Sequence, residues 1–96
     1  MHTKPEQIEF DPDKAASNER KHRVNFSDAE QALRDPLALT IDDPDSDDEP
    51  RFVAIGVDAL GRILVVVYVV RGGNVRLISA RKATSGEAGQ YHAQTL

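Results

Sequence analysis

The chain has 96 residues, 40% of them hydrophobic, no cysteine and a formal net charge of −4 at pH 7. A chain of this length forms one small domain, and without cysteine it has no disulfide or thiolate metal site, as is usual in a reducing cytoplasm. The amino terminus lacks the apolar segment of a signal peptide, and the longest apolar run, residues 63–70, is far shorter than the roughly 20 residues that span a bilayer. The composition therefore predicts a soluble cytoplasmic protein with no membrane segment.

The charge is divided unevenly along the chain. Residues 1–50 carry 6 Lys/Arg and 14 Asp/Glu, a balance of −8, whereas residues 51–96 carry 6 Lys/Arg and 2 Asp/Glu, a balance of +4. Phosphate binding depends on local cationic density rather than on the total charge. The second half is therefore suited to an anionic ligand, and the first half is suited to a basic partner.

A short strand and a helix are predicted at the start of the chain. Residues 8–10 have strand character, and Asp11 followed by Pro12 is a strong helix start, since Asp is a favourable N-cap and Pro fits the first helical position. This helix is expected to end near His22.

A second, shorter helix is predicted to begin at Ser27. Ser27 and Glu30 have the spacing of a capping box, in which each side chain satisfies a free backbone amide of the other. The helix is expected to end before Pro36, and residues 37–41 are expected to form a strand.

The segment Asp42–Glu49 is strongly acidic, with six carboxylates in eight positions. An alignment to a calcium-binding EF-hand loop fails, because Asp48 stands where glycine is required and Ala54 stands where the bidentate glutamate belongs. Two readings stay open: a solvated, flexible loop, or an electrostatic docking site for a basic partner.

The second half reads as consecutive strands with tight connections. Strands are predicted at residues 51–57 and 63–70, and Gly72–Asn74 offers the positive-φ positions of a tight reversal into a returning strand. Thr84 and Glu87 again have capping-box spacing, which predicts a short, glycine-weakened helix toward Tyr91. The fold class is therefore α+β, with a mainly antiparallel sheet of four to five strands, two N-terminal helices and a C-terminal helix.

Arginines bracket the predicted strands. Strict alternation of side chains places Arg62 and Arg71 on opposite faces of one strand, and it likewise separates Arg76 from Arg81 in the returning strand. A single arginine at a strand end is usually only solvated, but a guanidinium group also grips phosphate bidentately. The arginines considered for phosphate binding are Arg51, Arg62, Arg71, Arg76 and Arg81.

The pair Lys21–His22 follows the first predicted helix. Cationic side chains at a helix end often only interact with the helix dipole. The functional alternative is that Lys21 contacts phosphate while the imidazole of His22 moves a proton at neutral pH. The residues themselves predict no nucleophile triad, no P-loop, no metal site and no cofactor.

Several segments together resemble the family of BrnT-type toxins. The resemblance covers residues from about 10 to 91, and its Ile-Ser-Ala-Arg-Lys-Ala stretch is specific in this context. The segments that carry it are Phe10–Asn18, Lys21–His22, Phe26–Ala29, Arg51–Gly56, Gly61–Tyr68, Arg71 and Val75–Ala83.

The resemblance implies a ribonuclease toxin of a type II toxin–antitoxin pair with a RelE-like compact fold. Such a toxin cleaves RNA without a cofactor, inhibits translation and arrests growth. The resemblance also implies a BrnA-type antitoxin with a DNA-binding domain, which neutralises the toxin in a 2:2 heterotetramer. Operator DNA is then contacted only through the antitoxin.

The resemblance also directs attention to particular side chains. We expect Arg62 and Arg81 to clamp the phosphate with added charge from Lys21, and His22 or Glu49 to transfer the proton. The full set that matches the family pattern is Lys21, His22, Glu49, Arg51, Arg62, Arg76 and Arg81.

The chain departs from the family pattern in two places. Glycine usually follows the Lys-His pair, so Arg23 is expected to change the turn there, and the usual basic C-terminal helix is replaced by residues 84–91, which contain no Lys or Arg. The alternatives to a ribonuclease are therefore a catalytically decayed homologue that binds the antitoxin and takes part in operon autoregulation, and a small RNA- or ribosome-binding protein without catalysis.

Overall fold

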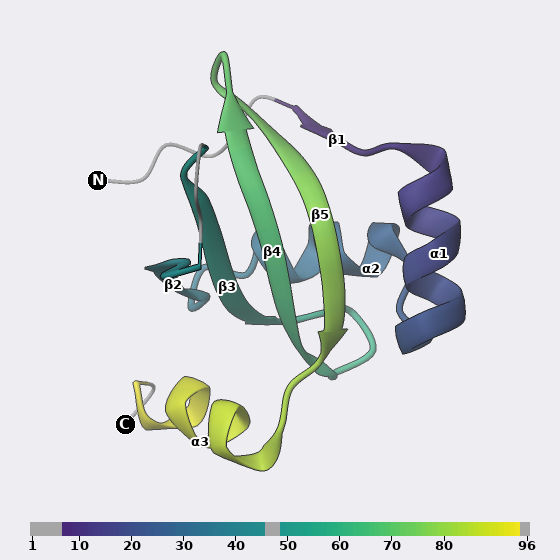
Figure 1. The fold of residues 1–96 in the computed structure, drawn as a ribbon. Coiled ribbons are helices and arrows are strands. Elements are labelled where there is room, and N and C mark those ends of the chain that lie inside the picture. The colour runs from purple at the N-terminus through teal and green to yellow at the C-terminus, as the bar shows by residue number, and fades with distance from the viewer. Residues whose placement is uncertain (1–6, 46–48, 95–96) are drawn as a thin grey trace.

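The computed structural model describes residues 7–45 and 49–94 (Figure 1). The central part of the acidic segment, on which the calcium alignment partly depended, therefore lies outside the described residues. Among the described residues, no helix has the length and apolar character needed to cross a membrane. The elements in chain order are β1 (Ile8–Glu9), α1 (Pro12–His22), α2 (Phe26–Leu33), β2 (Leu39–Asp42), β3 (Arg51–Val57), β4 (Ile63–Arg71), β5 (Asn74–Lys82) and α3 (Ser85–Ala93).

The strands form one sheet in the order β1-β5-β4-β3-β2, with β4 at its centre. β1 runs parallel to β5, and all the other neighbours are antiparallel. The predicted α+β class with a mainly antiparallel sheet is therefore confirmed. The position of β4 agrees with its unbroken apolar sequence, because β4 lies between β3 and β5, packs one face against the helices and has one end of its other face covered by α3.

One face of the sheet packs against α1 and α2, and we call it the helical face. Its core includes Leu64 and Val66 of β4, which lie against Phe26 and other buried residues of the first two helices. α2 approaches closely because β3 has a glycine at position 56, where a Cβ atom would lie 2.2 Å from the Ala32 carbonyl oxygen. Figure 1 shows α2 crossing behind the sheet.

The opposite face, which carries Val53, Val65 and Val67, is covered only at one end, and we call it the open face. There α3 packs Tyr91 against Val65 and Ile55. Figure 1 shows α3 below the sheet, at the end away from the β4–β5 turn. None of the described helices covers the hairpin end of this face, although Val69 is only 2% exposed there (Figure 1).

The predicted start of α1 is confirmed. Asp11 is the N-cap, and its side chain accepts a hydrogen bond from the Asp13 amide at 2.9 Å. At the other end Arg23 adopts a left-handed conformation, with φ 58°, and its amide donates to the Glu19 carbonyl at 2.9 Å. The arginine thus takes the conformation that glycine favours, and the expected change of the turn stays a prediction.

The predicted capping box of α2 is wrong. The N-cap is Asn25, whose side chain accepts from the Asp28 amide at 2.9 Å, so Ser27 lies inside the first turn. Glu30 instead forms an ion pair with Arg34 at 3.5 Å. Starting the helix at Phe26 lets this ring, which is 2% exposed, enter the core.

The strands match the predictions closely, with two differences. β2 is shifted to Leu39–Asp42, and β5 contains a register shift between its pairings with Val67 and Tyr68. Because of that shift, Arg76 pairs with Val69 and Arg81 pairs with Val65, both on the open face. The prediction that Arg76 and Arg81 face opposite sides is therefore wrong, since a β-bulge breaks the alternation.

The predicted turn and last helix are confirmed. Gly72 and Gly73 adopt φ values of 57° and 83°, as a two-residue hairpin turn with two left-handed positions requires. α3 begins with the expected capping box between Thr84 and Glu87.

Candidate functional site

A shallow hollow lies between α1 and β5, with a volume of about 200 Å³. It contains both Lys21 and His22, so the structure brings these two predicted site residues together. Its lining residues are Lys14, Ser17, Asn18, Lys21, His22, Ile78 and Ser79.

The sequence reasoning missed the remaining polar residues of this hollow. Lys14, Ser17 and Lys21 follow one another at intervals of three and four residues, the spacing that places side chains on one face of a helix. A helical projection of α1 would therefore have grouped them. Ser79 had no such signal, because its position depends on how β5 packs against α1.

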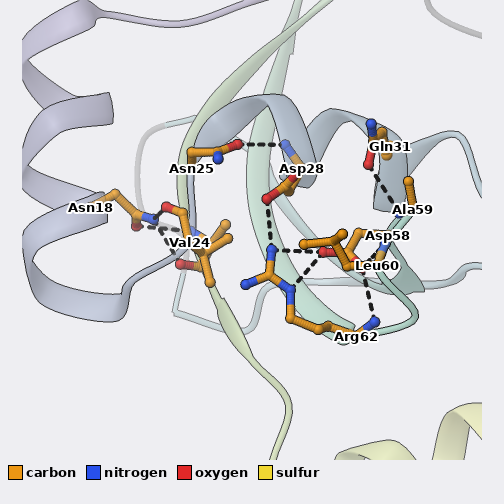
Figure 2. A network of polar contacts seen from close by, with 10 residues as sticks. Asn18, Val24, Asn25, Asp28, Gln31, Asp58, Ala59, Leu60 and Arg62 are labelled. Carbon is orange, nitrogen blue, oxygen red and sulfur yellow. Dashed lines mark hydrogen bonds and ion pairs between the residues drawn. The ribbon is translucent and has the colours of Figure 1, made fainter.

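Asn18 forms the floor of the hollow and holds its two walls together. Its side-chain amide donates to the Ala80 carbonyl at 2.8 Å and to the Val24 carbonyl at 2.9 Å, and its oxygen accepts from the Ala80 amide at 3.0 Å. The side chain thus bonds to β5 as a neighbouring strand would (Figure 2). α1 is therefore fixed against β5 at the residue next to Ser79.

The lysines of the hollow differ from the arginines of the sheet in whether a carboxylate lies beside them. Among the described residues, no ion pair involves Lys14 or Lys21, while Arg51, Arg62, Arg71, Arg76 and Arg81 each lie within 4 Å of a carboxylate. An incoming phosphate therefore displaces no protein carboxylate when it binds to the lysines. Within the candidate site, the hollow is therefore the place where an anion can bind to positive charge without breaking an ion pair.

Arg62 lies at the end of the sheet where α2 meets the β3–β4 turn. Its Nε donates to Asp58 Oδ2 at 2.8 Å, and its Nη2 donates to Asp28 Oδ2 at 2.6 Å. Figure 2 shows the guanidinium group between the two carboxylates. Asp58 Oδ1 also accepts from the backbone amides of Leu60 and Arg62. Arg62 is therefore part of the contacts that shape this turn and attach it to α2.

The ionisation of Asp58 depends on these contacts. Its side chain has no exposed surface, and burial alone raises the pKa of a carboxyl group. The hydrogen bonds from the backbone and guanidinium group of Arg62 outweigh burial, so the pKa of Asp58 lies below its usual value. The carboxylate is thus charged and needs the arginine beside it.

Arg81 lies on the open face and is held by Glu87 of α3. Its Nη1 and Nη2 donate to the two carboxylate oxygens at 2.7 and 2.8 Å. These hydrogen bonds, which outweigh the effect of burial, lower the pKa of Glu87 to about 2. Arg62 bonds to α2 on the helical face, so the two arginines expected to clamp one phosphate lie on opposite sides of the sheet.

Glu49 lies at the opposite end of the sheet, beside the β4–β5 turn. Its two oxygens accept from Arg71 Nε and Nη2 at 2.8 and 2.9 Å. The hydrogen bonds from Arg71 hold the pKa of Glu49 below its usual value. Ser79 of the hollow pairs with Val67 of β4, and Arg71 is four residues further along that strand. At 3.3 Å per residue, four residues correspond to roughly 13 Å along β4. The structure therefore separates Glu49 from His22.

The two remaining arginines of the predicted site, Arg51 and Arg76, also lie toward the hairpin end of the open face. Arg51 Nε is 3.5 Å from Asp43 Oδ2, and Arg76 Nη1 is 3.7 Å from Glu9 Oε1. Both pair with Val69 of β4 from opposite sides. These arginines thus form a group on one face, apart from the hollow.

In the described part of the chain, no three His, Asp or Glu side chains are placed together so that they could hold a metal ion.

Comparison with known proteins identifies a family and a similar solved structure. The model of the family described as "Ribonuclease toxin, BrnT, of type II toxin-antitoxin system" matches residues 10–87. This chain belongs to the BrnT family. The crystal structure of the Brucella abortus ribonuclease toxin BrnT is 27% identical in sequence, with a TM-score of 0.65, and the match covers 82% of this chain and 97% of that one. A search of curated proteins gives no match.

The family match agrees with the residues that carried the resemblance. It begins at Phe10 and ends at Glu87, so it includes α1, the hollow, all the arginines named above and the first turn of α3. A BrnT toxin is a type II toxin, and a type II toxin implies an antitoxin partner.

Proposed function

We propose that this chain is an endoribonuclease toxin that cuts RNA without a metal ion, inhibits translation and is neutralised by a BrnA-type antitoxin. The observation that carries the proposal is the hollow between α1 and β5, in which His22 lies beside Lys14 and Lys21. It combines an imidazole with two lysines that form no ion pair within the described residues.

The hollow supplies the groups that RNA cleavage requires. The 2′-hydroxyl loses its proton and attacks the adjacent phosphorus, the P–O5′ bond breaks, and the 5′-oxygen takes up a proton. His22 transfers the proton, and Lys14 and Lys21 stabilise the extra negative charge on the phosphate oxygens. Ser17 and Ser79 donate hydrogen bonds to the same group. Glu49, the alternative proton-transfer residue, is at the far end of the sheet.

The arginines contribute to RNA binding in separate places. Arg51, Arg76 and Arg81 contact phosphates of the flanking RNA on the open face, where each one exchanges a protein carboxylate for a phosphate. Arg62 bonds to α2 on the other side of the sheet, so in this proposal it contacts a different phosphate from Arg81. Because Arg62 also stabilises the fold, its contribution to RNA binding is found only when the stability and the activity of a variant are measured together.

The antitoxin completes the proposed function. It carries the DNA-binding domain, forms a 2:2 heterotetramer with the toxin and represses the shared operon in the cytoplasm. Operator DNA is bound through the antitoxin alone.

The test compares His22→Ala and Lys21→Ala with Lys82→Ala, which removes an exposed lysine outside the hollow. Purified proteins are incubated with RNA in the presence of a chelator, and cleavage rates are measured. We expect a loss of about 10²–10⁴-fold for His22→Ala, the usual contribution of a proton-transfer group. A smaller loss is expected for Lys21→Ala, and none for Lys82→Ala.

A His22→Ala variant that cuts at the wild-type rate would overturn the assignment of this site. The second candidate function is a decayed toxin that only binds its antitoxin, and it is favoured by the absence of Lys and Arg in α3. Wild-type protein that binds the antitoxin but neither fragments RNA nor arrests growth would establish that alternative.

A further inference from the structure

β2 is an edge strand with backbone groups that have no partner strand. It pairs with β3 alone and ends the sheet order among the described strands. The Asp43 amide donates to the Arg51 carbonyl at 2.8 Å, and Ile41 lies opposite Val53. Because hydrogen-bonding direction alternates along an antiparallel strand, the amides and carbonyls of Thr40 and Asp42 point away from β3. Such an edge is a template for another strand.

Exposed apolar side chains lie on and beside this edge. Ile41 is 56% exposed, and Leu37, shortly before the strand, is 51% exposed. Large apolar side chains that gather at a surface mark an interaction site more often than singly scattered ones do. The edge thus offers both backbone hydrogen bonds and apolar contacts.

The charge beside this edge is negative. Asp42 ends β2, and Asp43 and Asp45 follow it. Arg51 lies 3.5 Å from the Asp43 carboxylate and donates to the Asp45 carbonyl, but no ion pair involves the carboxylate of Asp42 or Asp45 in the part of the chain that the structure describes. The complementary ligand therefore carries positive charge.

The negative charge of these aspartates determines which kind of molecule can bind to the β2 edge. A second copy of the chain would place aspartates against aspartates, and RNA would bring phosphates to the same carboxylates, so both are repelled. An extended peptide segment with lysines or arginines satisfies the backbone, the apolar side chains and the charge together.

We propose that the β2 edge binds an extended, basic segment of the antitoxin, which adds a strand outside β2. Its backbone bonds to Thr40 and Asp42, an apolar side chain packs on Ile41, and a lysine or arginine faces Asp42 or Asp45. This inference rests on the proposed pairing with an antitoxin and is independent of RNA cleavage.

The first experiment measures the dissociation constant of the complex with the purified product of the reading frame adjacent to the toxin gene. Asp42→Pro removes an outward amide that β3 does not use, as edge strands tolerate, and Asp42→Asn is the matched control that removes the charge but keeps the amide. We expect binding to weaken by roughly tenfold or more for Asp42→Pro, and by only about threefold for Asp42→Asn. Leu60→Ser, which removes another exposed apolar side chain outside this edge, leaves the affinity unchanged.

The second experiment needs no variant, so it decides the question even when Asp42→Pro folds poorly. Hydrogen exchange of the wild-type chain is followed with and without the same antitoxin, and the Thr40 and Asp42 amides are expected to exchange far more slowly in the complex. The proposal is overturned if hydrogen exchange slows only in the hollow or on the open face. It is also overturned if the Asp42→Pro variant is folded and binds the antitoxin within twofold of wild type. Both readouts apply whether or not the chain cuts RNA.

Discussion

The two ends of the sheet use the same kinds of side chain for different purposes. At the turn end, Arg62 bonds to Asp58, whose side chain has no exposed surface, and to Asp28. At the hairpin end, Arg71 and Glu49 form an equally short bidentate pair, with side chains 56% and 40% exposed. The two ion pairs do not differ clearly in distance, but they differ in solvent exposure. A buried charge needs its partner for stabilisation, whereas an exposed charge is stabilised by water without one.

The exposure of its carboxylate partner decides whether an arginine can bind a ligand at little cost. An exposed arginine gives up its carboxylate for a phosphate without leaving a buried charge behind. An arginine that neutralises an enclosed carboxylate cannot exchange it for a phosphate unless the local fold changes. In the proposed function, the hairpin end of the open face is therefore the better surface for RNA, while the arginine at the turn end stabilises the fold.

The largest effect is expected when Arg62 is removed. Arg62→Ala leaves the enclosed carboxylate of Asp58 without its cation, which lowers the free energy of unfolding by about 2–3 kcal/mol. Arg71→Ala, the matched change at the hairpin end, is expected to lower it much less, because both side chains of that pair lie in solvent. Urea unfolding at pH 7 measures both. Equal effects for the two variants would show that exposure does not decide how much each ion pair stabilises the fold.

An intermediate effect is expected for the Arg81–Glu87 pair, which is less exposed than the pair at the hairpin. The pKa of Glu87 is about 2 in the folded chain and lies near 4.5 in an unfolded one. A carboxyl group with a lowered folded pKa stabilises the fold above its unfolded pKa, and this stabilisation is lost as the pH falls from about 4.5 to about 2.

Because both side chains are partly solvated, we expect the pair to contribute about 1–2 kcal/mol. Urea unfolding of wild type and Glu87→Gln at pH 6 and pH 2.5 measures this. The difference between the two proteins should be largest at pH 6 and much smaller at pH 2.5, which is close to the folded pKa of Glu87, and a constant difference would assign the stability to something other than ionisation.

The smallest effect is expected for Glu49→Gln. The pKa of Glu49 is lowered by Arg71, but the pair lies in solvent, so the unfolding midpoint should stay within error of wild type. Binding is the sharper readout: if Arg71 is then freed for phosphate, Glu49→Gln should bind RNA more tightly at low salt. A clear loss of stability would show that this end of the sheet is as interdependent as the other.

The parts of the fold that the sequence predicts are those with local causes. Asp11 and Pro12 start α1 through their own backbone preferences, and Gly72 and Gly73 supply the two left-handed positions of the hairpin turn. The capping box of α3 is equally local. In each case the neighbours along the chain determine the geometry.

The parts that could not be predicted depend on distant partners. The bulge in β5 appears only when the strand pairs with β4, and it moves Arg76 to the face of Arg81. The start of α2 is decided by burial of Phe26, which favours Asn25 over Ser27 as the N-cap. Lys21 and His22 were identified from the sequence, but the hollow around them is formed by a strand far along the chain.

The contact between Asn18 and Ala80 has a consequence for the order of folding. It joins residues 62 positions apart, so one wall of the hollow is made early in synthesis and the other only when β5 is complete. Contacts of such long range form late, and an 11-residue helix such as α1 is marginal by itself in water. Lys21 and His22 are thus present in every nascent chain, but the second wall of the hollow, which Ile78 and Ser79 supply, is missing until the last strand is in place.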